Sequence, residues 1–193
     1  MHTQRAKLYG LFDRALIGIV ILLVLVLTGV RMANSAELIP SLGLTRATEG
    51  NADAKMFGSL ALRTGVLPAI KGELEVAYRS EDMFDNRLHV SMWPVTASLW
   101  FSPLSTIYAG GGLGVYITKY DYDQDKIMFP ISDETKQDFG VHLGGGFKFP
   151  LAPSASVDLQ GRYVMLRAKD SPLVPEKFNP DFWMAKAGIA FGF

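Results

Sequence analysis

The sequence predicts an all-β protein, an eight-stranded antiparallel up-and-down barrel that spans a membrane and is preceded by a signal-peptide helix. Three observations lead to this prediction. An apolar run near the N-terminus has the layout of a secretory leader. The rest of the chain alternates between apolar residues and polar or small ones, segment after segment. Its last segment keeps this period of two up to Phe193.

Residues 1–36 are predicted to be the signal peptide. Three basic residues lie within the first 14, an apolar run follows from Ala15 to Val30, and small residues follow up to Ala36. A basic region, an apolar region and a small-x-small cleavage site are the parts of such a leader. We expect cleavage after Ser35 or Ala36, so that 37–193 form one barrel domain. The alternative is an uncleaved membrane helix, but the run is shorter than the span of about 20 residues that a bilayer needs.

Composition excludes several classes of function. The chain has 19 basic and 19 acidic residues, so no basic excess indicates a nucleic-acid partner. It has no cysteine, which excludes a disulfide framework, a thiolate metal site and a lipoprotein anchor. After the leader, no apolar run is long enough for a membrane helix, although the hydrophobic fraction is 49%. A membrane protein of this kind must spread its apolar residues over alternating strands.

Eight alternating segments after the leader are predicted as strands, at 38–47, 54–64, 70–80, 87–102, 105–119, 137–149, 155–167 and 182–193. The joins between them alternate in character. Those at 65–68, 102–105 and 150–154 are short and carry Pro or Gly, whereas those at 82–86, 120–136 and 168–181 are polar and mostly longer. Short periplasmic turns and longer extracellular loops are typical of outer-membrane barrels, and an even strand number places both ends in the periplasm.

Within each strand the apolar residues share one parity, and charged or small residues share the other. This pattern predicts a lipid-facing exterior, because a soluble barrel would place its apolar residues inside. The residues predicted to face lipid are Leu74, Val76 and Tyr78; Ile107, Ala109, Leu113, Val115 and Ile117; Phe139, Val141, Leu143, Gly145, Phe147 and Phe149; Val157, Leu159, Tyr163 and Met165; and Trp183, Ala185, Ala187, Ile189, Phe191 and Phe193.

The fourth strand departs from this rule. Its apolar residues lie at even positions up to Met92 and at odd positions from Val95 onward, so the phase changes at Trp93-Pro94. Proline cannot donate to a sheet ladder and is usually found at edges or bulges. We therefore expect a β-bulge at Trp93-Pro94 that restores the register. The alternative is that the first half of this segment is a loop.

Several titratable side chains stand at positions predicted to face inward, and we expect them to form an interior charge network. They are Arg63, Glu73, Glu75, Arg79, His142, Lys148, Asp158, Arg162 and Lys186. The interior of an eight-stranded barrel is only wide enough to be filled by side chains. Buried charges are costly unless they pair. We expect Lys148 to pair with Asp158, and Glu75 to meet Arg162 or Lys186. The result would be a polar plug; a gated conduction path is the alternative.

Inward glycines in the segment 110–114 are expected to make room for bulky neighbours such as Tyr108 and Tyr116. His142 is expected to be a hydrogen-bonded interior residue rather than a ligand, since no second histidine lies on a neighbouring predicted strand.

Candidate metal and catalytic motifs are weak. Asp121, Asp123 and Asp125 have the opening spacing of a calcium loop, but Lys126 and Ser132 stand where such a loop has Gly and Glu. They are candidate metal ligands, with a solvated acidic loop as the alternative. The pair His89-x-Ser91 resembles the His-x-Ser of outer-membrane lipid A deacylases, but Met92 stands where those enzymes have Asn. We therefore predict no catalytic residue, no cofactor and no enzymatic activity.

The end of the chain carries the most specific motif. Lys186, Gly188, Phe191 and Phe193 form a polar-x-Gly-x-x-aromatic-x-aromatic string. It resembles the C-terminal signal that the barrel-insertion machinery reads on the last strand of bacterial outer-membrane barrels. Together with the Gly-rich segment 108–116 and the segment 94–101, it makes the mature chain similar to small barrels of the OmpA/OmpX-like superfamily. Because no further residues follow Phe193, we expect no peptidoglycan-binding domain of the kind that follows the barrel in full-length OmpA-type proteins.

The resemblance implies a location in the outer membrane of a Gram-negative bacterium. It also implies contact with outer-membrane lipid and lipopolysaccharide, assembly by the insertion machinery, and a monomeric state. Three functions stay open. The first is a structural or interaction protein that presents extracellular loops above a plugged polar interior. The second is a narrow, porin-like channel for small or hydrophobic solutes, as in OmpW-like barrels. The third is an enzyme that modifies lipid A.

Overall fold

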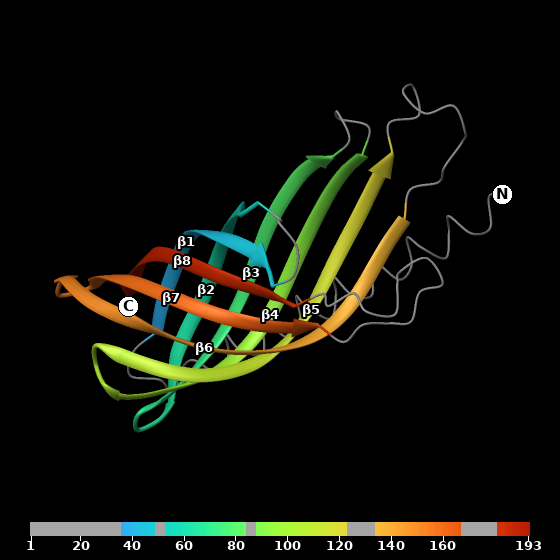
Figure 1. Cartoon of the computed structure of the whole chain (residues 1–193). Helices are drawn as coiled ribbons and strands as arrows, with labels where there is room; N and C mark the ends of the chain where they lie inside the picture. Colours follow the sequence, from blue (N-terminus) through green and yellow to red (C-terminus); the bar gives the residue numbers. More distant parts are fainter. Residues whose placement is uncertain (1–35, 49–52, 84–87, 123–133, 167–180) are drawn as a thin grey trace. The chain divides into compact units, whose positions relative to one another are not determined.

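The computed structural model describes residues 36–48, 53–83, 88–122, 134–166 and 181–193. They form eight strands: β1 (Ala36–Ala47), β2 (Lys55–Leu67), β3 (Ile70–Met83), β4 (Leu88–Leu104), β5 (Ile107–Tyr122), β6 (Glu134–Ala152), β7 (Ala155–Leu166) and β8 (Phe182–Gly192). Each strand pairs antiparallel with the next, and β8 pairs with β1, so the sheet is a closed barrel (Figure 1). The predicted fold class and the eight strands are confirmed.

The strands are longer at several ends than predicted. Each of the three short joins narrows to a two-residue turn, at 68–69, 105–106 and 153–154. Beside each turn the register of the hairpin shifts, between Gly65 and Leu67, between Phe101 and Leu104, and between Pro150 and Ala152. At the opposite end, strands β3 to β6 extend further than the other four (Figure 1).

Some predictions fall outside the described residues. Residues 1–35 of the expected signal peptide and two of the candidate metal ligands, Asp123 and Asp125, belong to this group. The backbone of Asp121 pairs with His89 near the end of β5. In the described ranges, no helix is long and apolar enough to cross a membrane.

The exterior of the barrel follows the predicted parity. Leu113 on β5, Leu143 on β6 and Trp183 on β8 expose 66%, 62% and 57% of their surface, whereas the residues next to them along the strand are more buried. Large apolar side chains are exposed in this way on all eight strands. A surface so rich in exposed apolar side chains suits hydrocarbon rather than water.

The expected bulge at Trp93-Pro94 is wrong. Strand β4 keeps one register with β5 through Trp93 and Pro94, and it has the same register with β3 on both sides of this point. Met92 is buried inside the barrel although the pattern placed it outside. The apolar phase changes because the interior itself changes from polar to apolar there, so an inward residue can be apolar without any bulge.

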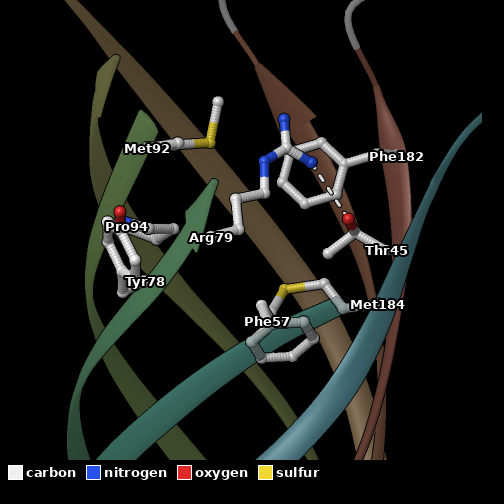
Figure 2. Close-up of a pocket in the computed structure, with 8 residues that line it drawn as sticks. All are labelled: Thr45, Phe57, Tyr78, Arg79, Met92, Pro94, Phe182 and Met184. Atoms are coloured by element: carbon white, nitrogen blue, oxygen red, sulfur yellow. Dashed lines mark hydrogen bonds between the residues drawn. The ribbon is translucent and has the colours of Figure 1, made fainter. Parts of the chain in front are cut away.

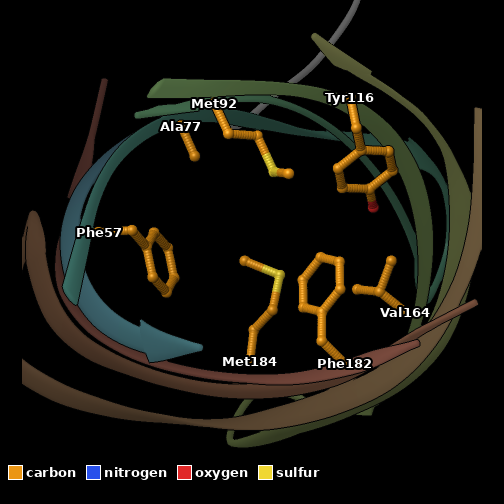
Figure 3. Close-up of a cluster of buried hydrophobic side chains, with 7 residues drawn as sticks. All are labelled: Phe57, Ala77, Met92, Tyr116, Val164, Phe182 and Met184. Carbon is orange, nitrogen blue, oxygen red and sulfur yellow. The ribbon is translucent and has the colours of Figure 1, made fainter. Parts of the chain in front are cut away.

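This apolar part of the interior lies toward the loop end of the barrel. Its buried side chains come from six of the eight strands and point into the lumen (Figure 3); they are Phe57, Ala77, Met92, Tyr116, Val164, Phe182 and Met184. The prediction of a polar interior therefore holds for only part of the barrel. Parity alone could not show this, because it does not report how the interior varies with depth.

Candidate functional site

The middle of the barrel interior holds a layer of six charged side chains, three cationic and three anionic. Strands β2, β3, β7 and β8 supply them, each from an inward position of the period-two pattern. All are 7% exposed or less; they are Arg63, Glu73, Glu75, Asp158, Arg162 and Lys186. We call them the charge layer. Its formal charge sums to zero, so each buried ionised group can have a partner of opposite sign, as buried charges require.

Arg63 joins two of the carboxylates in the charge layer. Its Nε donates to Oε2 of Glu73 at 2.8 Å, and its Nη1 donates to Oδ2 of Asp158 at 2.6 Å. Both carboxylates are nearly inaccessible, with side-chain exposures of 0% and 1%. The planar guanidinium offers five donors in a fixed fork, so one arginine can serve two acceptors on different strands.

Arg162 also joins two carboxylates, those of Glu73 and Glu75. Its Nη2 lies 2.6 Å from Oε1 of Glu73 and 2.5 Å from Oε2 of Glu75. Lys186 completes the layer by donating from Nζ to Oε1 of Glu75 at 2.6 Å. The expectation was that Glu75 meets Arg162 or Lys186; it forms an ion pair with Arg162 and a hydrogen-bonded ion pair with Lys186. The six side chains therefore form one connected chain of ion pairs.

Neutral polar and aromatic side chains fill the space around the charge layer. Tyr108 donates to Oδ1 of Asp158 at 2.7 Å and accepts from Gln160, whose amide oxygen accepts from Nε of Arg162 at 2.7 Å. Trp100 is fully buried, with the guanidinium carbon of Arg162 5.3 Å from its ring centre. The hydrogen bonds of Tyr108 and Gln160 satisfy buried donors and acceptors that water would otherwise have to reach.

Tyr108 fits because glycine faces it. A Cβ at Gly146 on β6 would lie 2.5 Å from the Cζ atom of the Tyr108 ring, too close for any side chain. A Cβ at Gly114 or Gly140 would likewise lie 3.0 Å from the ring of Tyr116. The glycines of β5 and β6 thus leave the inward volume that the two tyrosines occupy.

His142 is buried at the edge of the charge layer. Its Nε2 lies 2.9 Å from Oγ of Ser98, and its ring centre lies 6.3 Å from that of Trp100. Both its position and its hydrogen bond are those of an interior packing residue. No group of three His, Asp or Glu side chains suited to a metal ion occurs in the described ranges.

Lys148 does not bond Asp158. The two residues are direct partners in the β6–β7 ladder, but Lys148 bonds Glu37 of β1, and Lys71 lies 3.6 Å from the same carboxylate oxygen. The expected pair fails because Asp158 is already occupied by Arg63 and Tyr108. Lys148 is also more exposed than the charge layer, at 17% of its side chain, so it can turn toward the end with the short turns.

Arg79 lies apart from the charge layer, among the apolar side chains of the loop end. Its Nη1 donates to Oγ1 of Thr45 at 2.9 Å, and its guanidinium carbon lies 5.8 Å from the centre of the Phe182 ring. The expectation of a single network of nine residues is therefore replaced by a charge layer, a group around Glu37 at the end with the short turns, and Arg79 at the loop end.

Sequence reasoning missed several participants. Glu37 was overlooked because it stands at the expected cleavage site, before the first predicted strand. Tyr108 was assigned only a space-filling role, although it bonds both Arg63 and Asp158. Gln160 was left out of the expected network, although it bonds both Tyr108 and Arg162. Its position two residues from both Asp158 and Arg162, on the same face of β7, was the available signal.

The remaining candidate residues do not converge on a site. His89 is exposed and Ser91 is buried, both on β4. Three residues of the expected insertion signal, Lys186, Gly188 and Phe191, lie on β8 and pair with β1 and β7, with Gly188 opposite Ser41 and Phe191 opposite Leu38. Phe193 follows the end of β8, and its N–H donates to the carbonyl oxygen of Ala36 at 2.9 Å. A Cβ at Gly188 would lie 2.6 Å from the carbonyl oxygen of Pro40, so this seam of the barrel requires glycine.

Solved structures show which proteins share this fold. No protein-family model and no curated protein matches the chain. Ail, the attachment invasion locus protein of Yersinia pestis, is 14% identical with a TM-score of 0.57, covering 82% of this chain and 97% of that one. The outer membrane protein OprG from Pseudomonas aeruginosa is 14% identical with a TM-score of 0.55, covering 83% and 97%. A major outer membrane protein from Thermus thermophilus is 14% identical with a TM-score of 0.55, covering 82% and 99%.

At these identities the likeness concerns the fold. The fold is that of small eight-stranded outer-membrane β-barrels, as the resemblance implied. The bacterial outer-membrane proteins among these neighbours agree with the location predicted from the sequence and with the apolar exterior described above.

Proposed function

We propose that this chain, a barrel of the small outer-membrane type, is a structural or binding protein whose interior is closed to ions. The observation that carries the proposal is the charge layer: three cations and three anions, all buried and joined through one chain of contacts. An interior of this width is filled by side chains rather than water. We propose further that the barrel is monomeric and has membrane lipid and lipopolysaccharide as its surroundings.

The energetics support a closed state. Opening a path would require the ion pairs of Arg63 and Arg162 to separate, and removing one partner of a buried pair typically costs about 3–5 kcal/mol. Each arginine holds two carboxylates, so several pairs would have to break together. The apolar side chains toward the loop end form a second barrier, because an ion would lose its hydration there without gaining a partner.

The binding role rests on the loops. By the usual arrangement of these barrels, the end that carries the short turns faces the periplasm and the loop end faces outward. Strands β3 to β6 project furthest at the loop end (Figure 1). Ail, which shares the fold, was solved in complex with the heparin analogue sucrose octasulfate. It illustrates that a barrel of this size can serve as a surface-binding protein.

Planar-bilayer recording tests whether the interior is closed. The refolded barrel, residues 36–193, should show almost no steady conductance, whereas the variant Arg162→Ala should conduct because it removes the link between Glu73 and Glu75. The variant Leu113→Ala, on the outer face, is the control for refolding and should stay silent. Steady, ion-selective conductance by the unmodified protein would contradict the proposal and favour a channel.

Passage of small hydrophobic solutes is the second candidate, and the apolar cluster inside the loop end favours it. A polar plug alone would not need seven buried apolar side chains at this depth. Uptake of an uncharged apolar dye into vesicles that contain the barrel would support this candidate. No observation on the described residues favours the third candidate, a lipid A-modifying enzyme.

A further inference from the structure

The end of the barrel with the short turns holds a larger hollow than the loop end. The cavity at the loop end, beside Arg79 and Phe182, has a volume of about 10 Å³ (Figure 2), which is room for about one water molecule. The hollow at the short-turn end has a volume of about 310 Å³. It lies between the turns at 105–106 and 153–154 and the ends of β1 and β8. A hollow of this volume can take a small organic ligand.

Two backbone hydrogen bonds fix the rim of this hollow. The N–H of Lys148 on β6 donates to the carbonyl oxygen of Thr106 at 2.7 Å, and the N–H of Gly192 on β8 donates to the carbonyl oxygen of Ser154 at 2.8 Å. Each bond connects a two-residue turn to the strand that lies beside its hairpin. A rim that is fixed before binding loses little conformational freedom when a ligand enters, and this favours affinity.

Hydroxyl groups and one ammonium group line the hollow. The ammonium belongs to Lys148, and the hydroxyl groups belong to Ser105, Thr106, Ser154 and Ser156. Lysine, serine and threonine side chains are common donors to phosphate oxygens in proteins. Because an ammonium has three donors and Glu37 accepts from one of them, Lys148 can also donate to a ligand.

The charges at this end are not balanced. Lys148 bonds one carboxylate oxygen of Glu37, and Nζ of Lys71 lies 3.6 Å from the same oxygen, so two cations share one anion. The three short turns contain no charged side chain, and the neighbouring charge layer is itself neutral. A bound anion would therefore complete the pairing of the two lysines.

We propose that this hollow is a binding site for a phosphate ester of the size of a glycerol phosphate group. The phosphate oxygens accept from Nζ of Lys148 and from the hydroxyl groups of the two turns. These donors come from β6 and from both turns, so a tetrahedral phosphate fits them better than a planar carboxylate. Free glycerol phosphate and phospholipid headgroups share this chemistry. The inference does not depend on whether the barrel conducts.

Amide NMR of the refolded barrel, residues 36–193, in phosphatidylcholine nanodiscs tests the site, because both ends of the barrel are open to water there. Titration with α-glycerol phosphate should shift the amide signals of Thr106, Ser154 and Ser156 until they saturate, whereas glycerol, which has no charge, should not shift them. Nanodiscs with added phosphatidylglycerol separate the two sources. Shifts that appear in them without free ligand, and that glycerol phosphate does not change further, would assign the site to a lipid headgroup.

Variants separate the charge at this end from charge elsewhere in the lumen. Lys148→Gln should weaken the binding of glycerol phosphate by roughly tenfold, the effect of one lost charge-assisted hydrogen bond, and Lys148→Arg should retain most of it. Lys71→Gln should weaken binding less, because Lys71 does not line the hollow. Glu37→Gln should strengthen binding, because it removes the carboxylate that both lysines approach. The matched control Arg79→Gln removes an inward cation at the loop end (Figure 2) and should have no effect.

The direction of the Glu37→Gln effect distinguishes this proposal from other ligands. Weaker binding in that variant would overturn the proposal, since a site for a cation or a neutral polyol would depend on the carboxylate. Equal shifts with glycerol, shifts confined to the loop end, or equal losses in Lys148→Gln and Arg79→Gln would also overturn it. If Lys148→Gln fails to refold, Glu37→Gln and Lys71→Gln still decide, because they change the charge of the site in opposite directions.

Discussion

Arg63 on β2 and Asp158 on β7 meet inside the barrel, with Nη1 of the arginine 2.6 Å from Oδ2 of the carboxylate. The two strands do not pair with each other, since β2 lies between β1 and β3, and β7 lies between β6 and β8. Each side chain is only 1% exposed. The contact therefore exists only when the barrel is closed, and it reports on closure directly.

Breaking this pair should destabilise the barrel strongly. Asp158→Asn leaves Arg63 with one anionic partner fewer in a buried layer, and the loss of one member of such a pair typically costs about 3–5 kcal/mol. Adding Arg63→Met makes the layer neutral again and should recover part of the loss, with a coupling energy of about 0.5–3 kcal/mol. Urea unfolding in lipid vesicles measures all four proteins of this cycle.

Lys148 provides the control for that cycle. It is the ladder partner of Asp158 but bonds Glu37, which Lys71 also approaches. The double variant Lys148→Met with Asp158→Asn should show a coupling energy much smaller than that of Arg63 with Asp158. Comparable couplings would mean that Lys148 and Asp158 interact after all.

A charged side chain on the membrane face should lower the free energy of unfolding strongly near the middle of the membrane and only slightly near its edge. Leu113 lies near the middle of β5 and Leu104 lies beside the turn at 105–106; both are about equally exposed, at 66% and 60%. Leu113→Arg should lower the free energy of unfolding by about 2–4 kcal/mol and Leu104→Arg by about 0–1 kcal/mol. Equal losses in urea unfolding would contradict the assignment of a hydrocarbon-facing exterior.

Glycine should be essential where strands approach closely. A Cβ at Gly112 would lie 2.7 Å from Cα of Ser98 on the neighbouring strand, whereas the nearest atom to a Cβ at Gly161 is 4.0 Å away. Gly112→Ala should therefore cost about 1–3 kcal/mol through overpacking, and Gly161→Ala should be nearly neutral. If both substitutions have the same effect on urea unfolding, the close approach of β4 and β5 is not what requires glycine.

The last strand should be needed for insertion, as its resemblance to the barrel-insertion signal implies. Deleting Phe193 or replacing Phe191 with Ala should reduce the amount of protein in the outer-membrane fraction and increase degraded or periplasmic material. Phe149→Ala is the matched control, because Phe149 is an equally exposed aromatic residue on β6, at 49%. Normal outer-membrane levels of the truncated chain would argue against this role.

The sequence by itself determined the strand number, the order of the strands and, except in the first half of β4, which side chains face out. These features follow from local rules: a period of two sets the face of each residue, and Pro- or Gly-containing turns set the ends of the strands. Leu113 and Phe139 could be placed outside because each has polar or small neighbours along the chain. The C-terminal motif could also be recognised from the sequence, since its residues are close together along the chain.

Only the tertiary structure decided which interior residues meet. Closing the barrel brings β2 opposite β7, so that Arg63 forms an ion pair with Asp158. Lys148 forms its ion pair with Glu37 instead. Closure also fixes the position of each side chain along the barrel axis. This places Arg79 and the apolar cluster that includes Met92 at a different depth from the charge layer. Parity along a strand contains neither the partner across the lumen nor the height along the barrel axis, because both depend on the stagger between strands in the closed sheet.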